Sequence, residues 1–164
     1  MRNPQFIQSK IYTLPELLKE KNRWKILQKT TSFTNGCFDI LHQGHIFSLS
    51  QAAAESDYLI VGVNTDASVR RYKGPSRPIN PETARCLLLA SLLMVDAVVL
   101  FDEDTPLQLI TTLLPDVLVK GGDYTLEQIV GAPEVIAAGG RVVINPIVEG
   151  FSTTGTLEKI RRDV

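Results

Sequence analysis

The sequence predicts an α/β fold in which a parallel sheet is covered by helices on both faces. Strand-like and helix-like segments alternate along most of the 164 residues. Residues 58–63 and 95–101 form apolar runs without regular polar alternation, as expected of strands buried on both faces. Polar, mostly glycine-bearing segments follow four predicted strands, at residues 35–45, 64–66, 120–123 and 149–154. Because ligands of open parallel sheets bind beyond the carboxyl ends of the strands, these segments predict one functional edge.

The first predicted element is a helix that begins at the capping box Thr13-Leu14-Pro15-Glu16 and ends near Leu27. Its lysine and arginine side chains are interpreted as a solvated surface, with a basic docking face as the alternative. The predicted strands then cover residues 31–34, 58–63, 96–101, 117–120 and 141–145. Between and after them, the spacing predicts helices at 45–55, 66–72, 82–93, 105–114, 126–138 and 153–162, and a loop at 73–80. No linker divides the chain, so we expect one domain over residues 1–164, with a helical extension at 1–29 and a core at 30–164.

Composition narrows the class of protein. The 17 basic and 18 acidic residues give a net charge of −1, which does not suit nonspecific nucleic-acid binding and favours a small polar metabolite as partner. The two cysteines, Cys37 and Cys86, lack CxxC spacing and are interpreted as reduced thiols. No apolar run approaches the length of a membrane span and the polar start is no signal peptide, so we expect no membrane partner and a cytoplasmic location.

Residues 34–45 read T-N-G-C-F-D-I-L-H-Q-G-H and contain the only two histidines of the chain, His42 and His45. They fall where a predicted strand turns into a predicted helix, a junction at which free N–H groups and the helix dipole favour an anion. Gly44 between them allows a ligand to approach the backbone closely. The pattern predicts a phosphate site, and the alternative is a pair of histidines satisfied within a loop.

Neither a G-x-G-x-x-G fingerprint nor a P-loop follows any predicted strand, so the phosphate site is of another kind. The segment at 34–45 resembles the opening motif of the HxGH nucleotidyltransferases, which are related in fold to class I aminoacyl-tRNA synthetases. V-G-V-N-T-D-A-S-V-R-R-Y-K-G-P-S-R-P-I-N at 61–80, D-V-L-V-K-G-G-D-Y at 116–124 and E-G-F-S-T-T at 149–154 resemble the adenylyltransferase domain of the bacterial D-glycero-β-D-manno-heptose 1-phosphate enzymes. The resemblance covers about residues 30–162.

This resemblance implies a Rossmann-like three-layer sandwich with a five-stranded parallel sheet in the order 3-2-1-4-5. It also implies transfer of an adenylyl group from ATP to the heptose 1-phosphate, which gives ADP-heptose and pyrophosphate for lipopolysaccharide core synthesis. In many relatives the domain is fused to a sugar kinase, so a separate heptose kinase is expected upstream here. A homodimer is expected, and Mg²⁺ is expected to arrive with ATP, because no carboxylates stand at metal-ligand spacing.

The resemblance also assigns roles. The nucleophile is an ionised phosphate oxygen, so the protein has only to position the substrates and neutralise charge. His42 and His45 are expected to donate hydrogen bonds to the phosphates as charge develops, and Lys73 to close over them from its loop. A solvated surface lysine is the alternative for Lys73.

The remaining predicted site residues fall in two groups. The expected nucleotide-binding residues are Asn35, Gly36, Cys37, Phe38, Gly44, Lys120, Gly121, Asp123, Ser152, Thr153 and Thr154. The expected substrate-binding residues are Asp39, Asn64, Asp66, Arg77 and Arg85. Alternatives are an Asx-turn at Asp39, a helix cap at Asp66 or at residues 152–154, and an ordinary surface cation at Arg85.

Three other functions are weighed against this one. A cytidylyltransferase acting on glycerol 3-phosphate or another polyol phosphate would keep the fold and the reaction. A nucleotide-binding regulator without catalysis would be hard to reconcile with intact His42, His45 and Lys73. A tRNA ligase fragment is disfavoured, since the chain offers neither an anticodon-binding domain nor a basic surface.

Overall fold

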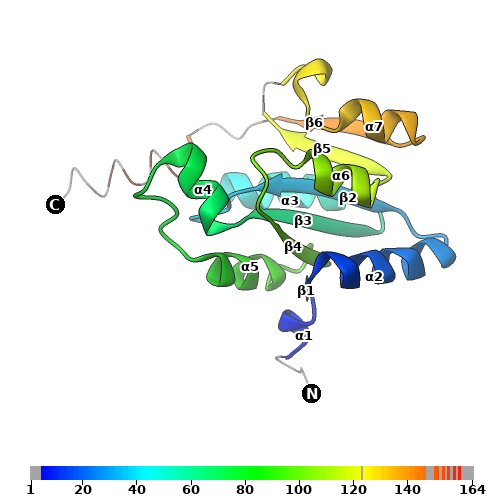
Figure 1. The fold of residues 1–164 in the computed structure, drawn as a ribbon, viewed down its shortest axis with the longest axis horizontal. Coiled ribbons are helices and arrows are strands. Elements are labelled where there is room, and N and C mark those ends of the chain that lie inside the picture. The colour runs from blue at the N-terminus through cyan, green and yellow to red at the C-terminus, as the bar shows by residue number, and fades with distance from the viewer. Residues whose placement is uncertain are drawn as a thin grey trace.

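The computed structural model describes residues 5–122, 124–146, 150 and 151, and the single residues 153, 155, 157 and 159. In this part of the chain, six parallel strands form one sheet in the order β1-β4-β3-β2-β5-β6 (Figure 1). The strands are β1 (Ile11–Tyr12), β2 (Thr31–Gly36), β3 (Tyr58–Asn64), β4 (Ala97–Phe101), β5 (Val117–Gly121) and β6 (Arg141–Asn145). No helix among the described residues is both long enough and apolar enough to cross a membrane.

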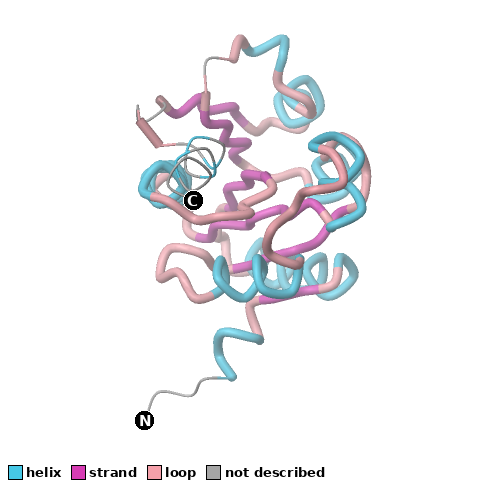
Figure 2. The backbone as a smooth tube through the Cα atoms, turned by 90° about the vertical axis from the view of Figure 1, so that its left-hand side faces the viewer, coloured by secondary structure: helices cyan, strands magenta, loops and turns pink. Residues whose placement is uncertain are grey.

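Helices cover both faces of the sheet, as the side view shows (Figure 2). The helices are α1 (Gln5–Gln8), α2 (Leu14–Ile26), α3 (Gln43–Ala53), α4 (Asp66–Lys73), α5 (Glu82–Ala90), α6 (Leu107–Leu113), the 3₁₀ turn η1 (Leu126–Gln128) and α7 (Ala132–Ala137). Residues of α2, α6 and α7 share one buried cluster with the sheet, and residues of α3 and α5 share a second cluster on the opposite face. The predicted α/β class is therefore confirmed.

Strand β3 shows why these residues form a central strand. Its Ile60 belongs to the first cluster, whereas Leu59, Val61 and Val63 belong to the second, because successive side chains of a strand point to opposite faces. Gly62 leaves room for the Phe33 ring of β2, since a Cβ at this position would lie 2.8 Å from Phe33 Cζ. Burial on both faces explains why the run is apolar throughout.

The predicted number of strands, five, was wrong. The missed strand β1 has only two residues, too few to show a periodicity, and it joins the sheet at its edge by pairing with β4. The stated order 3-2-1-4-5 was incomplete for this reason; counted from β2, the other five strands do follow one another in that order.

One predicted helix is divided in the structure, and another falls mostly outside the described residues. The predicted helix 126–138 is divided into η1 and α7, because Gly131 between them has a left-handed φ of 85°. The helix predicted over 153–162 falls mostly on residues outside the described part of the chain. By contrast, the capping box at α2 is confirmed, with Thr13 N donating to Glu16 Oε2 at 2.9 Å.

The strand order places a crevice at the carboxyl ends of β2 and β5. The chain leaves β2 toward β3 on one side and later returns from β4 to β5 on the other side of β2. Helices that follow such strands diverge, and ligands collect between them. The loop after β2 leads directly into α3 with its two histidines.

Candidate functional site

The two histidines lie against each other at the start of α3. His42 is the N-cap of this helix, His45 lies in its first turn, and their ring centroids are 3.8 Å apart with an interplanar angle of 26°. Gly44 permits this arrangement, because a Cβ there would lie only 3.1 Å from His42 Nδ1. The His42 side chain makes no capping hydrogen bond, so it leaves the first N–H groups of α3 available to a ligand. Backbone donors and imidazoles therefore point to one anion site.

Both imidazoles are neutral at pH 7 in the free protein. Burial, together with nearby His42 and Lys73, lowers the pKa of His45 to about 4. Burial also lowers the pKa of His42 below its ordinary value. The Nδ1 atoms of both rings are buried and have no hydrogen-bond partner among the described residues. An anionic ligand would supply a negative countercharge, which stabilises an imidazolium, and it would therefore favour the protonated forms of both rings.

Asp39, in the loop between β2 and α3, is bound by residues of the loop that follows α4. Its buried carboxylate accepts hydrogen bonds from Arg77 Nε at 2.7 Å, Ile79 N at 2.8 Å and Asn80 N at 2.9 Å. Burial raises the pKa of Asp39, but the hydrogen bonds from Asn80, Ile79 and Arg77 outweigh burial and lower it overall. The structure thus pairs Asp39 with Arg77, both predicted to contact substrate, and fastens the loop after α4 to the loop of the histidines.

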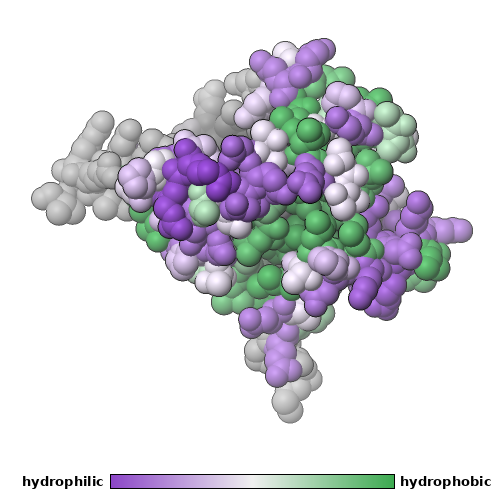
Figure 3. Space-filling view, in the orientation of Figure 1, coloured by the Kyte–Doolittle hydropathy of each residue, from purple (hydrophilic) through white to green (hydrophobic). Residues whose placement is uncertain are grey.

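Lys73 is the last residue of α4, whereas the sequence placed it in a flexible loop. The helix ends at Gly74, whose positive φ of 91° is a conformation that glycine adopts readily because it has no Cβ. At its other end, Thr65 caps α4 by accepting a hydrogen bond from Ser68 N at 3.1 Å. Arg71 Nε contacts Asp104 Oδ1 at 2.9 Å and so fixes α4 to the segment after β4. The surface over α4 is strongly hydrophilic (Figure 3).

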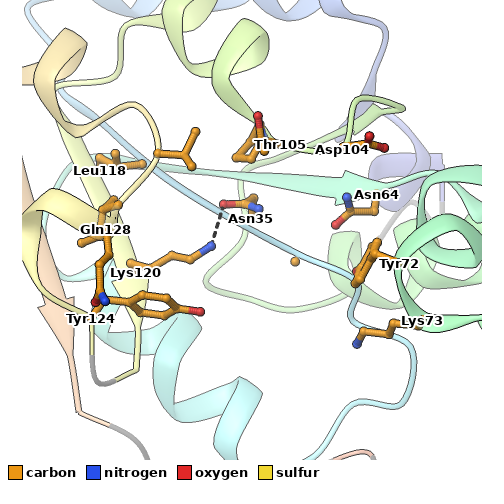
Figure 4. A pocket seen from close by; sticks show the side chains of 14 residues that line it. Asn35, Asn64, Tyr72, Lys73, Asp104, Thr105, Leu118, Lys120, Tyr124 and Gln128 are labelled. Atoms are coloured by element: carbon orange, nitrogen blue, oxygen red, sulfur yellow. Dashed lines mark hydrogen bonds between the residues drawn. The ribbon is translucent and has the colours of Figure 1, made fainter.

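A cavity of about 380 Å³, here called the lysine pocket, opens at the carboxyl edge of the sheet. Lys73 and Lys120 reach into it from opposite sides, and Asn35 lies between them (Figure 4). Lys120 Nζ donates to Asn35 Oδ1 at 3.2 Å, and burial lowers the pKa of Lys120. Asn64 at the end of β3 and Asp104 after β4 add polar groups to the wall. The pocket offers two cations for an anion, with hydrogen-bonding groups around them.

A second cavity, here called the histidine pocket, adjoins the first and has a volume of about 250 Å³. His45 lines it, and its wall shares Asn35, Gly36, Lys120 and Tyr124 with the lysine pocket. A smaller hollow of about 180 Å³ continues past His42 to Phe151, whose ring centroid is 6.5 Å from that of His42. Two ligands could therefore lie on either side of Lys120 with their phosphates facing each other.

The structure brings most of the predicted site residues together, but not all of them. Lining residues of these three cavities include the predicted Asn35, Gly36, Cys37, Phe38, His42, Gly44, His45, Asn64, Lys73, Lys120 and Gly121. Arg85 is fully buried beneath the site, where its ion-pair partner is Asp66, and neither of these two predicted substrate-binding residues lines the three cavities. Thr153 Oγ1 donates to Ile40 O at 3.4 Å. Asp123, Ser152 and Thr154 lie outside the described residues.

Several residues that line these cavities were not predicted from the sequence. Those with polar or aromatic side chains include Ser48, Tyr72, Asp104, Thr105, Tyr124, Gln128 and Phe151. Asp104 and Thr105 follow β4 closely, so the rule that selected the other strand ends could have found them. Ser48 lies one turn after His45 on α3, where spacing along a helix places residues on one face. The described residues contain no group of three or more His, Cys, Asp or Glu side chains that could hold a metal ion.

Known proteins resemble this chain in sequence and in fold. The bifunctional protein HldE of Rhodospirillum rubrum is 53% identical over 152 residues, which are 93% of this chain and 31% of the relative. The bifunctional protein HldE of Mesorhizobium japonicum is 57% identical over 138 residues, 84% of this chain and 28% of the relative. The chain thus spans about 30% of the length of these curated relatives.

The solved structures include a lipopolysaccharide core biosynthesis protein from Thermoplasma volcanium, at 30% identity and a TM-score of 0.58, covering 73% of this chain and 97% of that chain. Pantothenate synthetase from Thermus thermophilus is similar in its Rossmann-like fold only. It is 17% identical, with a TM-score of 0.62 over 94% of this chain and 70% of that chain. The cytidylyltransferase-like family model matches residues 33–155, which include both histidines and both pocket lysines. The chain belongs to this cytidylyltransferase-like family of nucleotidyltransferases.

Proposed function

We propose that this chain transfers the adenylyl group of ATP to D-glycero-β-D-manno-heptose 1-phosphate and releases pyrophosphate. The observation that carries the proposal is the pair of adjoining pockets that share Asn35, Gly36 and Lys120 beside the stacked histidines. Such a transfer needs two phosphate-bearing substrates held face to face. The 53% identity to a bifunctional HldE and the Thermoplasma structure's link to lipopolysaccharide core biosynthesis support this reaction over cytidylyl transfer.

In the proposed arrangement, ATP occupies the histidine pocket and the sugar phosphate occupies the lysine pocket. A phosphate oxygen of the sugar attacks the α-phosphorus of ATP, a new P–O bond forms, and the bond to the β-phosphate oxygen breaks with release of pyrophosphate. Negative charge shifts toward the leaving pyrophosphate during this step. His42, His45 and the first N–H groups of α3 would donate to the nucleotide phosphates from one side.

Lys120 and Lys73 would neutralise the charge of the two approaching phosphates from the other sides. Their contribution is chiefly to overcome repulsion between two anions and to align them, because an ionised phosphate needs no general base. Mg²⁺ would enter with ATP, held by its phosphates.

We also propose that the chain forms a homodimer, for which the half-exposed Leu87 and Leu88 of α5 offer apolar surface. A separate heptose kinase would supply the sugar 1-phosphate.

The direct test is pyrophosphate release. We expect turnover with ATP and D-glycero-β-D-manno-heptose 1-phosphate, and little turnover when CTP replaces ATP or glycerol 3-phosphate replaces the sugar. Preferred turnover of CTP with glycerol 3-phosphate would keep the site but overturn the proposed substrates. ATP binding without pyrophosphate release from any acceptor would overturn catalysis.

ATP binding is expected to take up protons. The pKa of His45 is about 4 in the free protein, and a bound triphosphate stabilises the imidazolium, so binding raises this pKa. Because the bound state then holds more protons than the free state, affinity should increase as the pH falls from neutral toward the free-state pKa. Calorimetry in two buffers with different ionisation enthalpies measures the uptake. A pH of about 6 lies in the range where the uptake is expected, and any protonation change of the ATP phosphates, whose pKa is also about 6, is common to wild type and variant. The difference between wild type and His45→Ala isolates the histidine, and equal values in the two proteins would contradict the prediction.

A further inference from the structure

Arg85 on α5 is a fully buried cation at the centre of the functional edge. Its guanidinium makes four hydrogen bonds, each to a different segment of the chain. They run from Nη1 to Cys37 O at 2.6 Å, from Nη2 to Asn64 O at 2.8 Å and to Asp66 Oδ1 at 2.8 Å, and from Nε to Asn80 O at 3.1 Å. Three of the four acceptors are backbone carbonyls, so the arginine holds main chain in place.

The bond to Cys37 leads to the histidines. Cys37 precedes Phe38, which has a left-handed φ of 49°, a conformation that a bulky residue adopts only when its surroundings impose it. The Phe38 ring packs on His45, with centroids 5.3 Å apart. A shift of the Cys37 carbonyl would therefore move Phe38 and, through it, the His45 ring.

The other bonds lead to the lysine. Asn64 ends β3 and Asp66 begins α4, the helix whose last residue is Lys73. Asn80 belongs to the segment that returns from Lys73, and its backbone N–H and side-chain amide both bind Asp39, in the loop of the histidines. One guanidinium thus connects the histidine loop, the end of β3, the start of α4 and the segment after it.

Arginine suits this place because its planar fork presents five donors in fixed directions and stays charged when buried. A lysine could keep the charge but not reach four acceptors in the same geometry. We propose that Arg85 is a positioning residue that sets the distance between the histidine pair and Lys73 without touching either substrate. The expected effect of Arg85 on catalysis rests on the proposed nucleotidyl transfer, whereas its expected effect on the position of the histidines does not.

The substrate-independent test uses the two histidines, which alone give imidazole signals because the chain contains only two. Nitrogen-detected NMR of the imidazoles in Arg85→Lys should show shifted or broadened signals for His45 and His42. The matched control is Leu17→Ala, which opens the core at a fully buried position of α2, away from the two pockets, and lowers Tm without moving the histidine loop. Unchanged imidazole signals in folded Arg85→Lys would overturn the proposal.

The kinetic test compares kcat and KM well below the Tm of each variant. A misplacement of about 1 Å at a reacting centre can cost about 10²-fold in rate, so we expect kcat to fall at least tenfold in Arg85→Lys and further in Arg85→Met. Leu17→Ala should retain kcat within about twofold at a similar loss of Tm. Arg85 variants whose activity only follows the folded fraction, as in the control, would show a role in stability alone.

A third variant keeps the test decisive if both Arg85 variants fail to fold. Asp66→Asn leaves the guanidinium and its three backbone acceptors in place and removes its charged partner, which is partly exposed. We expect a several-fold loss of kcat and a smaller shift of the imidazole signals; wild-type values for both would overturn the proposal. If the wild-type protein releases no pyrophosphate, the proposed function is contradicted. The imidazole signals would still test whether Arg85 positions the histidines.

Discussion

His45→Ala is expected to lower kcat for pyrophosphate release by about 10² to 10³ and to leave the fold intact. The imidazole lies in the first turn of α3, lines the histidine pocket and is stacked on His42 at 3.8 Å. A donor fixed in this position needs no reorganisation when charge builds on the nucleotide phosphates, and water that fills the space after truncation does. Because the interaction strengthens in the transition state, kcat should fall more than KM rises.

The matched control for this prediction is Gln51→Ala, an exposed position farther along the same helix. It should keep wild-type kinetics, and near-ultraviolet circular dichroism should confirm the fold of both variants. Turnover of His45→Ala within about threefold of wild type would remove this side chain from the mechanism, since a lost oxyanion-type donor costs far more.

Local patterns predicted much of the fold because they reflect local physics. The apolar run of β3 follows from burial on both faces, and the capping box of α2 from hydrogen bonds within four residues. The histidine pair was predicted for the same reason, since a strand, a turn and a helix start follow one another directly in the chain. Strand β1 was not predicted, because its two residues form a strand only through pairing with β4.

The roles of Asp39, Arg77 and Arg85 depended on contacts that no local pattern encodes. The partners Asp39 and Arg77 are 38 residues apart, and Arg85 binds a carbonyl 48 residues away. From sequence alone, an arginine on an amphipathic helix is a surface cation or a ligand for phosphate. Only the convergence of four segments on α5 makes it a buried donor, and this convergence is a property of the whole fold.

Lys73→Ala is expected to reduce kcat by about 10², comparable to the loss of another charge-stabilising donor at the site. Lys73 and Lys120 face each other across the lysine pocket, and Lys73 is close enough to His45 to lower its pKa. With Lys73 absent, the repulsion between the sugar phosphate and the nucleotide would be less well neutralised in the transition state. The same truncation should raise the pKa of His45 slightly, since it removes a nearby positive charge.

The control for Lys73 is Arg70→Ala, which removes an exposed cation from the same helix that does not line the lysine pocket. A general effect of positive charge on the approach of anionic substrates would lower kcat/KM in both variants and would weaken with salt. A specific contact would lower kcat in Lys73→Ala alone and persist at high ionic strength. Equal losses in the two variants would assign Lys73 to electrostatic steering, and unchanged kinetics in both would make the end of α4 a surface feature without a part in the reaction.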